Sequence, residues 1–564
     1  MHDVDELEAD NKRERLLAPS STPLPARLRR TLFWRTVPLL AVGYGFCFVD
    51  RSNLAFGELK MRSDPKLNLT TTDFALSAGI FFAGYATMQV PALHCIERIG
   101  ARRVVSALLV IWGLLGSACG LIQNTTQLCA LRFALGLAEA GYYPGVLYHF
   151  TTWLPDEMLG IASAAFTMTG AGVGIVVGNL SSGAILSAKA LDGLLGLAAW
   201  RWLFLLQGFP AVLVGFAVYT LLSDSPRSAT WLSDEQRAAL LARLASSHDA
   251  VGATADDVAE PVREQPASAI AAINHHVATA MPAEGATSAA EPLPPPAAPP
   301  PLPLLIAVYR TLRRRVTYVM IGYYFGNASG AYVLIFFLPL LLSELLPSWT
   351  PFTISCLVAF PSLLGVVVAV SSAAWVDSAP SKHARLRRRL GMMVCGSAIH
   401  LTLGISAGLA MLRASSPALS SAGRKSCSVL SLVLLSLAVP VGSVGNGPFW
   451  ATHHELQPNA LKATSIAVIN AMGNLGGFAG PFVLGALKTT LGPPCPPARV
   501  DGGHELSPHH HGCVSQWAWG MVLTFGATQA LSLMTCALLI RISGAARRAP
   551  GAGSSGGDGA AGSS

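Results

Sequence analysis

Charged residues are scarce in this sequence. Only 12% of its 564 residues are Asp, Glu, Lys or Arg, whereas 52% are hydrophobic. Soluble globular proteins carry about 25% charged residues. Here apolar runs of about 20 residues recur about a dozen times, and each is long enough to cross a bilayer as a helix. The shortage of charge argues against a large soluble enzyme with an apolar core, and it predicts an all-α polytopic membrane protein.

Motifs for nucleotide, metal and redox chemistry are also missing. The sequence has no GxxxxGK[ST] loop to cradle ATP phosphates, which argues against an ATP-driven pump. Its ten cysteines are scattered, mostly within apolar runs, and form no CxxC pair and no His-Cys cluster with metal-ligand spacing. We assign the net charge of +8 to cytosolic Lys and Arg rather than to nucleic-acid binding. We therefore expect no enzyme activity, no cofactor, no metal and no nucleic-acid partner.

The start of the chain shows no cleavable signal peptide, because the first apolar run follows a polar tail. Acidic residues crowd positions 3–10, which argues against an organelle transit peptide. Arg27, Arg29 and Arg30, with Arg35 at the membrane edge, precede the first run and place the N-terminus in the cytosol by the positive-inside rule. We expect the plasma membrane, with an organelle membrane as the alternative.

The apolar runs divide into two groups of six. The first six predicted spans are 32–54, 74–96, 104–123, 128–151, 159–187 and 201–222. The second six are 316–343, 352–376, 390–412, 427–450, 462–486 and 515–541. The predicted domains are a tail at 1–31, a six-helix bundle at 32–222, a linker at 223–315, a second bundle at 316–541 and a tail at 542–564. An even number of spans places both tails in the cytosol.

The linker between the bundles is polar, and its stretch 250–303 is rich in Ala and Pro. Such a composition cannot bury a core, so we expect a largely disordered cytosolic linker, with both tails disordered as well. A loop with an acid followed by basic residues occurs after span 2 and again after span 8. This recurrence indicates two pseudo-symmetric halves of six spans, which is the arrangement of major-facilitator transporters.

Two spans of the first half carry charges where the flanking residues are apolar: Asp50 and Arg51 at the end of the first run, and Arg132 and Glu139 in the fourth. A charge at the centre of a membrane helix costs about 2.5–3.5 kcal/mol on insertion scales, so such residues are rare and usually functional. Arg132 and Glu139 are two helical turns apart, so they share a face and differ in depth by about 10 Å. From the directions of the two spans, we expect Asp50 to lie level with Arg132, and Glu139 one or two turns deeper.

These charges suggest a division of roles. Arginine is always charged and offers a planar fork that fits a carboxylate, so we assign Arg51 to a substrate anion. Burial and a neighbouring arginine act in opposite directions on the protonation of a carboxyl group, so Asp50 and Glu139 are candidates for proton coupling. The alternative is a permanent ion pair that only holds spans 1 and 4 together. We assign Arg132 to that structural role, as the internal counter-ion of Asp50.

The second half carries almost no charge in mid-membrane, so we expect it to supply neutral contacts to the substrate. Asn470 and Asn474 are one turn apart in span 11 and face the same way. An amide in a membrane needs a partner, either a ligand or another helix. Trp450 and Tyr143 complete the expected substrate-binding set. The alternative for Tyr143 is packing, and the alternative for Trp450 is an interfacial aromatic anchor.

Charged loops flank the spans on the cytosolic side. Glu97, Arg98 and Arg102 follow span 2, and Asp377 and Arg385 follow span 8. Ion pairs from such loops can hold the two halves together on the cytosolic side while a carrier faces outward, which shifts the balance of states. The alternative reading is that these charges only fix the topology.

Glycines recur at four-residue spacing in two spans that occupy equivalent places in the halves. Gly170, Gly174 and Gly178 lie in span 5, and Gly473 and Gly477 lie in span 11. Small residues at this spacing let helix backbones approach closely. We expect these two glycine faces to form the moving contact between the halves.

Six stretches match a known family pattern. They are 50–53 (DRSN), 79–85 (GIFFAGY), 99–103 (IGARR), 132–145 (RFALGLAEAGYYPG), 447–451 (GPFWA) and 469–481 (INAMGNLGGFAGP). With them the chain resembles the major facilitator superfamily and, within it, the anion:cation symporter family of sugar-acid, tartrate, phthalate and allantoate permeases. Vesicular glutamate and sialic acid transporters are relatives of that family. The resemblance covers 33–232 and 316–541.

The resemblance implies a secondary transporter that carries a small organic anion with protons by alternating access and works as a monomer in the lipid bilayer. In the family, the arginine that matches Arg51 and the acids that match Asp50 and Glu139 are associated with anion binding and proton coupling. The position of Trp450 tends to line the cavity. One departure is Phe48, where many members have a tyrosine. A simple transfer of any one member's substrate is therefore in doubt.

Two other functions stay open from the sequence. One is a sodium-driven, potential-driven or exchanging anion carrier on the same fold. The other is a nutrient sensor that does not transport, because such sensors tend to have long cytosolic extensions and the linker here is long. A disulfide between Cys495 and Cys513 is conceivable, since both flank the outer loop between spans 11 and 12.

Overall fold

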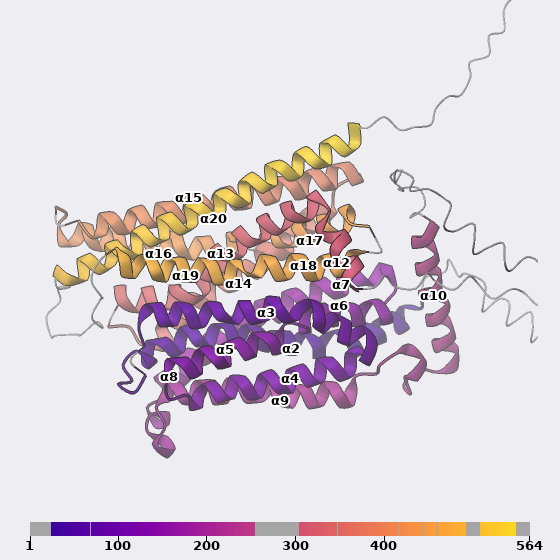
Figure 1. Ribbon diagram of the computed structural model, residues 1–564, viewed down its shortest axis with the longest axis horizontal. Helices are drawn as coiled ribbons and strands as arrows, with labels where there is room; N and C mark the ends of the chain where they lie inside the picture. Colours follow the sequence, from indigo (N-terminus) through magenta and orange to yellow (C-terminus); the bar gives the residue numbers. More distant parts are fainter. Residues whose placement is uncertain are drawn as a thin grey trace, which may run out of the picture.

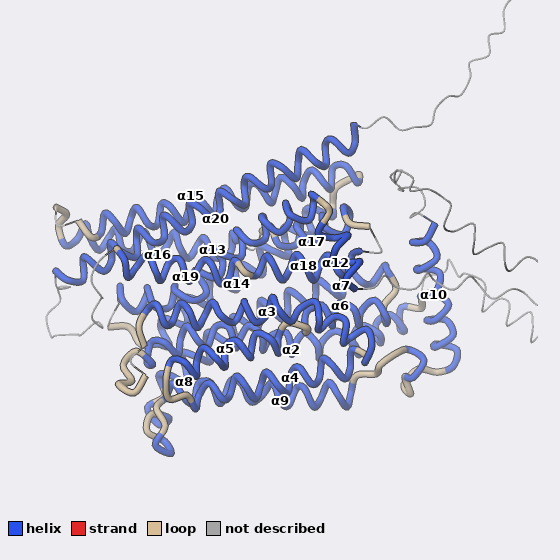
Figure 2. Tube along the Cα trace, in the orientation of Figure 1, coloured by secondary structure: helices blue, strands red, loops and turns tan. Residues whose placement is uncertain are grey.

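The computed structural model describes residues 24–253, 304–491 and 508–548, except positions 68, 347, 417, 443, 459 and 460. These ranges contain helices and short connections, and no strand is found within them (Figure 2). Within the same ranges, 11 helices are long and apolar enough to cross a membrane. Their axes run roughly along one direction (Figure 1). The prediction of an all-α polytopic membrane protein is confirmed.

The first half is built from eight α-helices joined by short 3-10 and π segments. They are α2 (Ala26–Met61), α3 (Thr71–Ile99), α4 (Ala101–Ala118) with η1 (Cys119–Leu121), α5 (Thr125–Glu139), α6 (Tyr142–Trp153), α7 (Asp156–Thr167) with η2 (Met168–Val173), α8 (Gly174–Ser187) and α9 (Ala199–Leu221). The short turns η3 (Lys189–Leu191) and η4 (Leu194–Gly196) join α8 to α9.

The second half follows the same plan. Its helices are α13 (Arg315–Leu345), α14 (Pro351–Asp377), α15 (Lys382–Ala414), α16 (Ser421–Gly442), α17 (Asn446–Leu456), α18 (Lys462–Asn474), α19 (Gly476–Thr490) and α20 (Pro508–Arg548). The pairs α16 and α17, and α18 and α19, each correspond to one predicted span.

The fourth predicted span is broken into α5 and α6, each too short to cross a membrane alone. This is why the helices long enough to span number 11 in the described ranges while the spans number twelve. The break falls at Ala140 and Gly141, and Pro144 explains it. A proline ring clashes with the carbonyl group four residues earlier, which here belongs to Ala140, so a continuous helix is strained at this point.

The two halves lie side by side, with the first half drawn in indigo to magenta and the second in orange to yellow (Figure 1). Two pairs of helices make most of the contact between them: α3 packs along α19, and α8 packs along α14. Helix α2 also contacts α13 at the centre. Residues on α2 therefore face the second half, and this is the helix that carries Asp50 and Arg51.

Side-chain caps fix where several helices begin. Thr70 and Asp73 form a reciprocal capping box at the start of α3, with both bonds at 3.1 Å. Asn124 accepts a bond of 2.9 Å from the backbone of Gln127 at the start of α5. Gly100 joins α3 to α4 with φ of 99°, a conformation that residues with a side chain rarely adopt.

Both ends of the predicted linker are helical, but most of it lies outside the described residues, so its largely disordered character stays a prediction. Its start forms η5 (Pro226–Ser228) and α10 (Asp234–Ala253), and its end forms α12 (Leu304–Leu312). Helix α10 lies across one end of the bundle (Figure 1). The sequence 250–303 predicted disorder from composition alone, and most of that stretch lies outside the described residues. The helices at either end carry Leu and Arg, and Trp231 directly precedes α10.

Aromatic stacking holds the start of the linker to the first half. The rings of Trp231 and Trp153 stack with centroids 5.5 Å apart, and the Arg35 guanidinium lies 5.5 Å from the Trp231 ring. Arg243 of α10 forms an ion pair of 3.2 Å with Glu157. The described part of the linker up to α10 therefore belongs structurally to the first half.

The tails also start and end differently from the expected boundaries. Helix α2 begins at Ala26, inside the tail predicted for 1–31, and α20 continues to Arg548, inside the tail predicted for 542–564. The residues just before the first predicted span include Arg and Thr. These residues lower the local hydropathy, but they are compatible with an α-helix. Hydropathy therefore marked the apolar core of each span and not the ends of its helix.

The glycine faces play a different part from the expected one. A side chain at Gly174 would lie 2.5 Å from the carbonyl oxygen of Gly45, so this face of span 5 packs on α2 within the first half. Gly473 likewise meets Tyr324 within the second half. Only Gly477 of the predicted glycines packs across the halves, against Phe82. The expectation that both faces form the moving contact is wrong, since small residues are equally useful for close packing inside a half.

Candidate substrate and proton site

Arg51 lies in the C-terminal half of α2, is only 5% exposed, and contacts both halves of the protein. Its Nη2 donates to Glu139 of α5 in the first half, where the two side chains also form an ion pair. Its Nη1 donates to the hydroxyl of Tyr332 on α13 in the second half, at 2.6 Å. A single guanidinium therefore bridges the two bundles.

Aromatic rings surround the Arg51 guanidinium. Five ring centroids lie 5.1–6.0 Å from its central carbon, and they belong to Phe48, Phe81, Phe82, Tyr85 and Tyr332. The negative faces of such rings attract a cation, and a cation removed from water gains more from them. We call Arg51 and these five rings the Arg51 cage. It can hold a buried positive charge while leaving part of the planar fork for a ligand.

Asp50 and Arg132 lie at the same depth, as the sequence predicts, but their contact is not a carboxylate ion pair. Arg132 Nη1 donates to the backbone carbonyl of Asp50 at 3.3 Å. The Asp50 carboxylate instead accepts a bond of 3.2 Å from Asn53 and lies against Gly116 of α4. Both residues are 1% exposed. The expected direct counter-ion pairing is therefore replaced by a contact through the backbone.

Several polar atoms of this cluster have no hydrogen-bond partner among the described residues. They are Asp50 Oδ2, Glu139 Oε2 and, on the arginines, Arg51 Nε, Arg132 Nε and Arg132 Nη2. Buried polar atoms without partners are costly, and in native proteins they often mark a site that a ligand, a proton or water completes. The unpartnered carboxylate oxygens are places where a proton can bind.

Glu139 is the last residue of α5, immediately before the break in the fourth span. The favoured interpretation of the sequence placed Glu139 deeper and assigned Arg51 to the substrate, whereas an ion pair between spans 1 and 4 was the stated alternative. The structure shows the two side chains in direct contact. A substrate anion and the Glu139 carboxylate would therefore compete for the same guanidinium.

The two asparagines of span 11 form a chain that crosses between the halves. Asn474 Nδ2 donates to the side-chain oxygen of Asn470 at 2.9 Å, and Asn470 Nδ2 donates to the hydroxyl of Tyr85 at 3.3 Å. Tyr85 belongs to α3 and to the Arg51 cage. The asparagines thus reach the cage through a tyrosine of the opposite half.

Tyr143 and Trp450 lie in separate aromatic clusters. Tyr143 packs with Tyr44 of α2, with ring centroids 5.4 Å apart, and Trp450 packs with Tyr324 of α13 at 5.5 Å. Among the described contacts, neither ring lies over Arg51. The structure therefore does not bring these two predicted residues into the cage.

The charged cytosolic loops make contacts within their own halves. Arg102 pairs with Asp224 at 3.7 Å, and Glu97 pairs with His94 at 3.9 Å. Across the described residues, no ion pair joins the loop charges of Glu97, Arg98 and Arg102 to the second half. The side chain of Asp377 lies outside the described residues, so a pair between it and Arg385 or the first half stays a prediction.

Sequence reasoning did not find Tyr332, Tyr85 and Asn53. Each lies in an apolar helix, where a tyrosine or asparagine is as often a packing residue as a ligand. A weak signal existed for Tyr85, which ends the family stretch at 79–85, and for Asn53, which ends the stretch at 50–53. No sequence signal distinguished Tyr332 from the other tyrosines of span 7.

Comparison with known proteins agrees with this architecture. The family model described as Major Facilitator Superfamily matches residues 31–481. The chain is 28% identical over 469 residues to a protein of Agrobacterium vitis named "Putative tartrate transporter", covering 83% of this chain and 87% of that protein. It is 27% identical over 450 residues to the inner membrane transport protein RhmT of Escherichia coli, covering 80% and 86%.

A solved structure shares the fold. The crystal structure of a bacterial homologue of the human lysosomal transporter Spinster superposes with a TM-score of 0.61 at 15% identity, covering 92% of this chain and 98% of that one. At this identity the likeness concerns the fold alone. Together with the family match over most of the sequence, it establishes that this chain belongs to the major facilitator superfamily of membrane transporters.

Proposed function

We propose that this transporter carries a small organic anion, such as a carboxylate, a sugar acid or a carboxylated vitamin, together with protons. The observation that carries the proposal is Arg51, a buried guanidinium that contacts Glu139 in one half and Tyr332 in the other. In an alternating-access carrier the substrate binds between the halves, near mid-depth. A carboxylate is the group that the planar fork of arginine recognises best.

Charge balance links the anion to a proton. Arg51 and Glu139 together are neutral, and both are buried. An arriving anion would leave the site with an uncompensated negative charge, which is costly inside a membrane protein. A proton on Glu139 restores neutrality and releases Arg51 for the substrate. Loss of that proton on the cytosolic side re-forms the Arg51–Glu139 pair and expels the anion.

Asp50 is the second candidate for proton binding. Both halves also offer uncharged polar groups to the substrate. The free Oδ2 of Asp50 can accept a proton while its Oδ1 stays bonded to Asn53. Tyr332, Tyr85 and Asn470 offer hydroxyl and amide groups to the non-ionic part of a substrate. The Agrobacterium and Escherichia relatives carry transport names, and the tartrate name is consistent with a hydroxylated acid. The carrier works as a monomer and without a cofactor.

The test uses purified protein in liposomes and a panel of tartrate, sugar acids and nicotinate. The proposal expects uptake of at least one acid when the outside is acidified, with no requirement for sodium. It also expects Arg51→Lys to lose uptake, because the charge remains but the fork is lost. Uptake that needs sodium, or that needs only an internal exchange anion, would favour the alternative carriers. Binding of an acid without flux would favour a sensor.

A further inference from the structure

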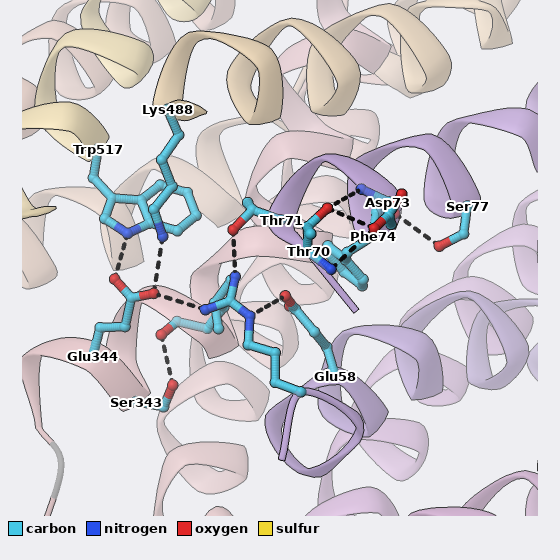
Figure 3. A network of polar contacts seen from close by, with 12 residues as sticks. Glu58, Thr70, Thr71, Asp73, Phe74, Ser77, Ser343, Glu344, Lys488 and Trp517 are labelled. Atoms are coloured by element: carbon cyan, nitrogen blue, oxygen red, sulfur yellow. Dashed lines mark hydrogen bonds and ion pairs between the residues drawn. The ribbon is translucent and has the colours of Figure 1, made fainter. Parts of the chain in front are cut away.

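A second cluster of charged residues joins the two halves at the end of the bundle opposite α10 and α12. Glu58 lies near the end of α2, and Arg62 follows that helix directly. Glu344 lies near the end of α13, Lys488 near the end of α19, and Trp517 in α20 (Figure 3). With the N-terminus in the cytosol, these positions are at the outer side of the membrane. We call these five residues the outer cluster.

Most contacts of the outer cluster stay within one half. In the first half, Arg62 Nε lies 3.1 Å from Glu58 Oε1. In the second half, Lys488 Nζ lies 2.9 Å from Glu344 Oε1, and the Trp517 indole donates to Glu344 Oε2 at 2.5 Å. Among the residues that the structure describes, one ion pair crosses between the halves, from Arg62 Nη1 to Glu344 Oε1 at 3.3 Å.

The rim around the cluster is closed on both sides of the interface. Thr72 of α3 and Thr489 of α19 have hydroxyl groups 3.4 Å apart, and a side chain at Gly485 would meet Ala75 at 2.5 Å. On the other side, the backbone of Phe352 in α14 donates to Ser187 of α8 at 3.0 Å. The halves therefore touch along the outer edge in this structure.

We propose that the outer cluster is the outer gate of the transporter and that it opens by breaking the single pair Arg62–Glu344. Each half then keeps its own neutral pair: Glu58–Arg62 in the first and Glu344–Lys488 in the second. No buried charge loses its last partner when the halves separate. This inference rests on the proposed alternating access, but it concerns the outer gate and not the substrate site.

Two charges, Arg62 and Glu344, would be enough to join the halves. The need for a partner within each half after opening explains why the outer cluster contains four charges. Leaving a buried charge without a partner is strongly destabilising. A gate made only of Arg62 and Glu344 would leave one unpaired charge on each half after opening, and water alone would have to compensate it. Glu58 is 0% exposed and Lys488 is 2% exposed. Glu58 stays paired with Arg62, and Lys488 with Glu344, when the gate opens, which lowers the free-energy cost of opening. Across the interface, Glu58 attracts Lys488 but repels Glu344, and Lys488 repels Arg62, so these longer-range forces oppose one another.

The proposal predicts opposite effects for the two kinds of residue. Arg62→Gln and Glu344→Gln remove the pair that crosses the interface, so they should favour the open outer side. Glu58→Gln and Lys488→Gln leave that pair intact and remove the partner that the open state relies on. These two variants should favour the closed outer side. A cluster that only stabilises the fold would give four changes in the same direction.

The measurement is the rate of cross-linking between Thr72→Cys and Thr489→Cys in membranes, with the joined peptide detected by mass spectrometry so that native cysteines stay in place. Closure brings these two positions together, and no substrate is needed. We expect Arg62→Gln and Glu344→Gln to slow cross-linking about three- to tenfold. Glu58→Gln and Lys488→Gln should cross-link at least as fast as the parent. Lys66→Gln, an exposed charge change in the same outer loop, is the control and should have no effect.

A double variant guards against loss of folding. Glu58→Gln with Arg62→Gln removes the whole first-half pair, leaves that half neutral, and should slow cross-linking like Arg62→Gln alone. Slowing by all four single variants, or a parent rate in Arg62→Gln and Glu344→Gln, would overturn the gate. Because cross-linking is read without substrate, a wrong substrate class would not affect this result. Conversely, a failed gate would leave the proposed anion transport standing.

Discussion

Arg51 of the first half donates a hydrogen bond of 2.6 Å to the hydroxyl of Tyr332 in the second half. This contact joins the bundles at the buried charge that we assign to the substrate. A hydroxyl at this place can also donate to a bound carboxylate. We therefore expect Tyr332 to be a second-half residue of the substrate site.

Tyr332→Phe should weaken substrate binding while the fold is kept. A hydrogen bond to a charged group is worth about 1.5–3 kcal/mol, so we expect KM for the transported acid to rise roughly tenfold or more. Uptake at graded substrate concentrations measures this. Tyr318→Phe is the matched control, since Tyr318 lies on the same helix and is 57% exposed. Equal KM values in the two variants would contradict the assigned role.

The contact between Asn470 and Tyr85 should be energetically coupled across the halves. We expect Asn470→Ala and Tyr85→Phe to be non-additive in kcat/KM, with a coupling of about 0.5–1.5 kcal/mol. A double-mutant cycle on uptake measures it. Asn327→Ala provides the control, because Asn327 bonds to Asn446 within the second half. Additive effects of the first pair would show that the crossing bond does not contribute.

Trp231→Ala should release α10 from the first half without changing transport. Stacked aromatic pairs contribute about 0.5–1.5 kcal/mol beyond their burial, so local opening should increase up to about tenfold. Limited trypsin digestion at Arg237 and Arg243 measures that opening. Trp349→Ala, at a 42% exposed tryptophan of the second half, should leave the digestion rate unchanged. Unchanged digestion of Trp231→Ala would mean that the stack does not hold α10.

The sequence allowed the spans and the charge cluster to be predicted because both depend on the cost of placing polar groups in a membrane. That cost singled out Asp50, Arg51, Arg132 and Glu139, and the structure brings all four together. Their pairing could not be predicted, since it depends on side-chain reach and on the break of the fourth span. Helical periodicity predicted the depth of Arg132, but it did not predict that the Arg51 side chain contacts Glu139.

Residues at helix ends were harder to predict for a different reason. Glu58, Arg62, Glu344 and Lys488 lie where a membrane helix meets water, and charges there usually need no explanation. The role proposed for these four residues depends on how α13 and α19 pack against the first half. A local sequence pattern carries no information about that packing. Helix α10 was missed because the polar composition of its neighbourhood outweighed a short stretch of Trp and Leu.

The central claim is that a proton on Glu139 accompanies the anion. The most direct measurement follows proton and substrate entry together, in liposomes that contain the parent protein or Glu139→Gln under an imposed pH gradient. We predict that the gradient drives uptake and proton entry in the parent. Glu139→Gln should retain binding and exchange of the acid but lose both the gradient dependence and the accompanying proton entry. If Glu139→Gln still accumulated the acid with the parent's response to the gradient, the account would be contradicted.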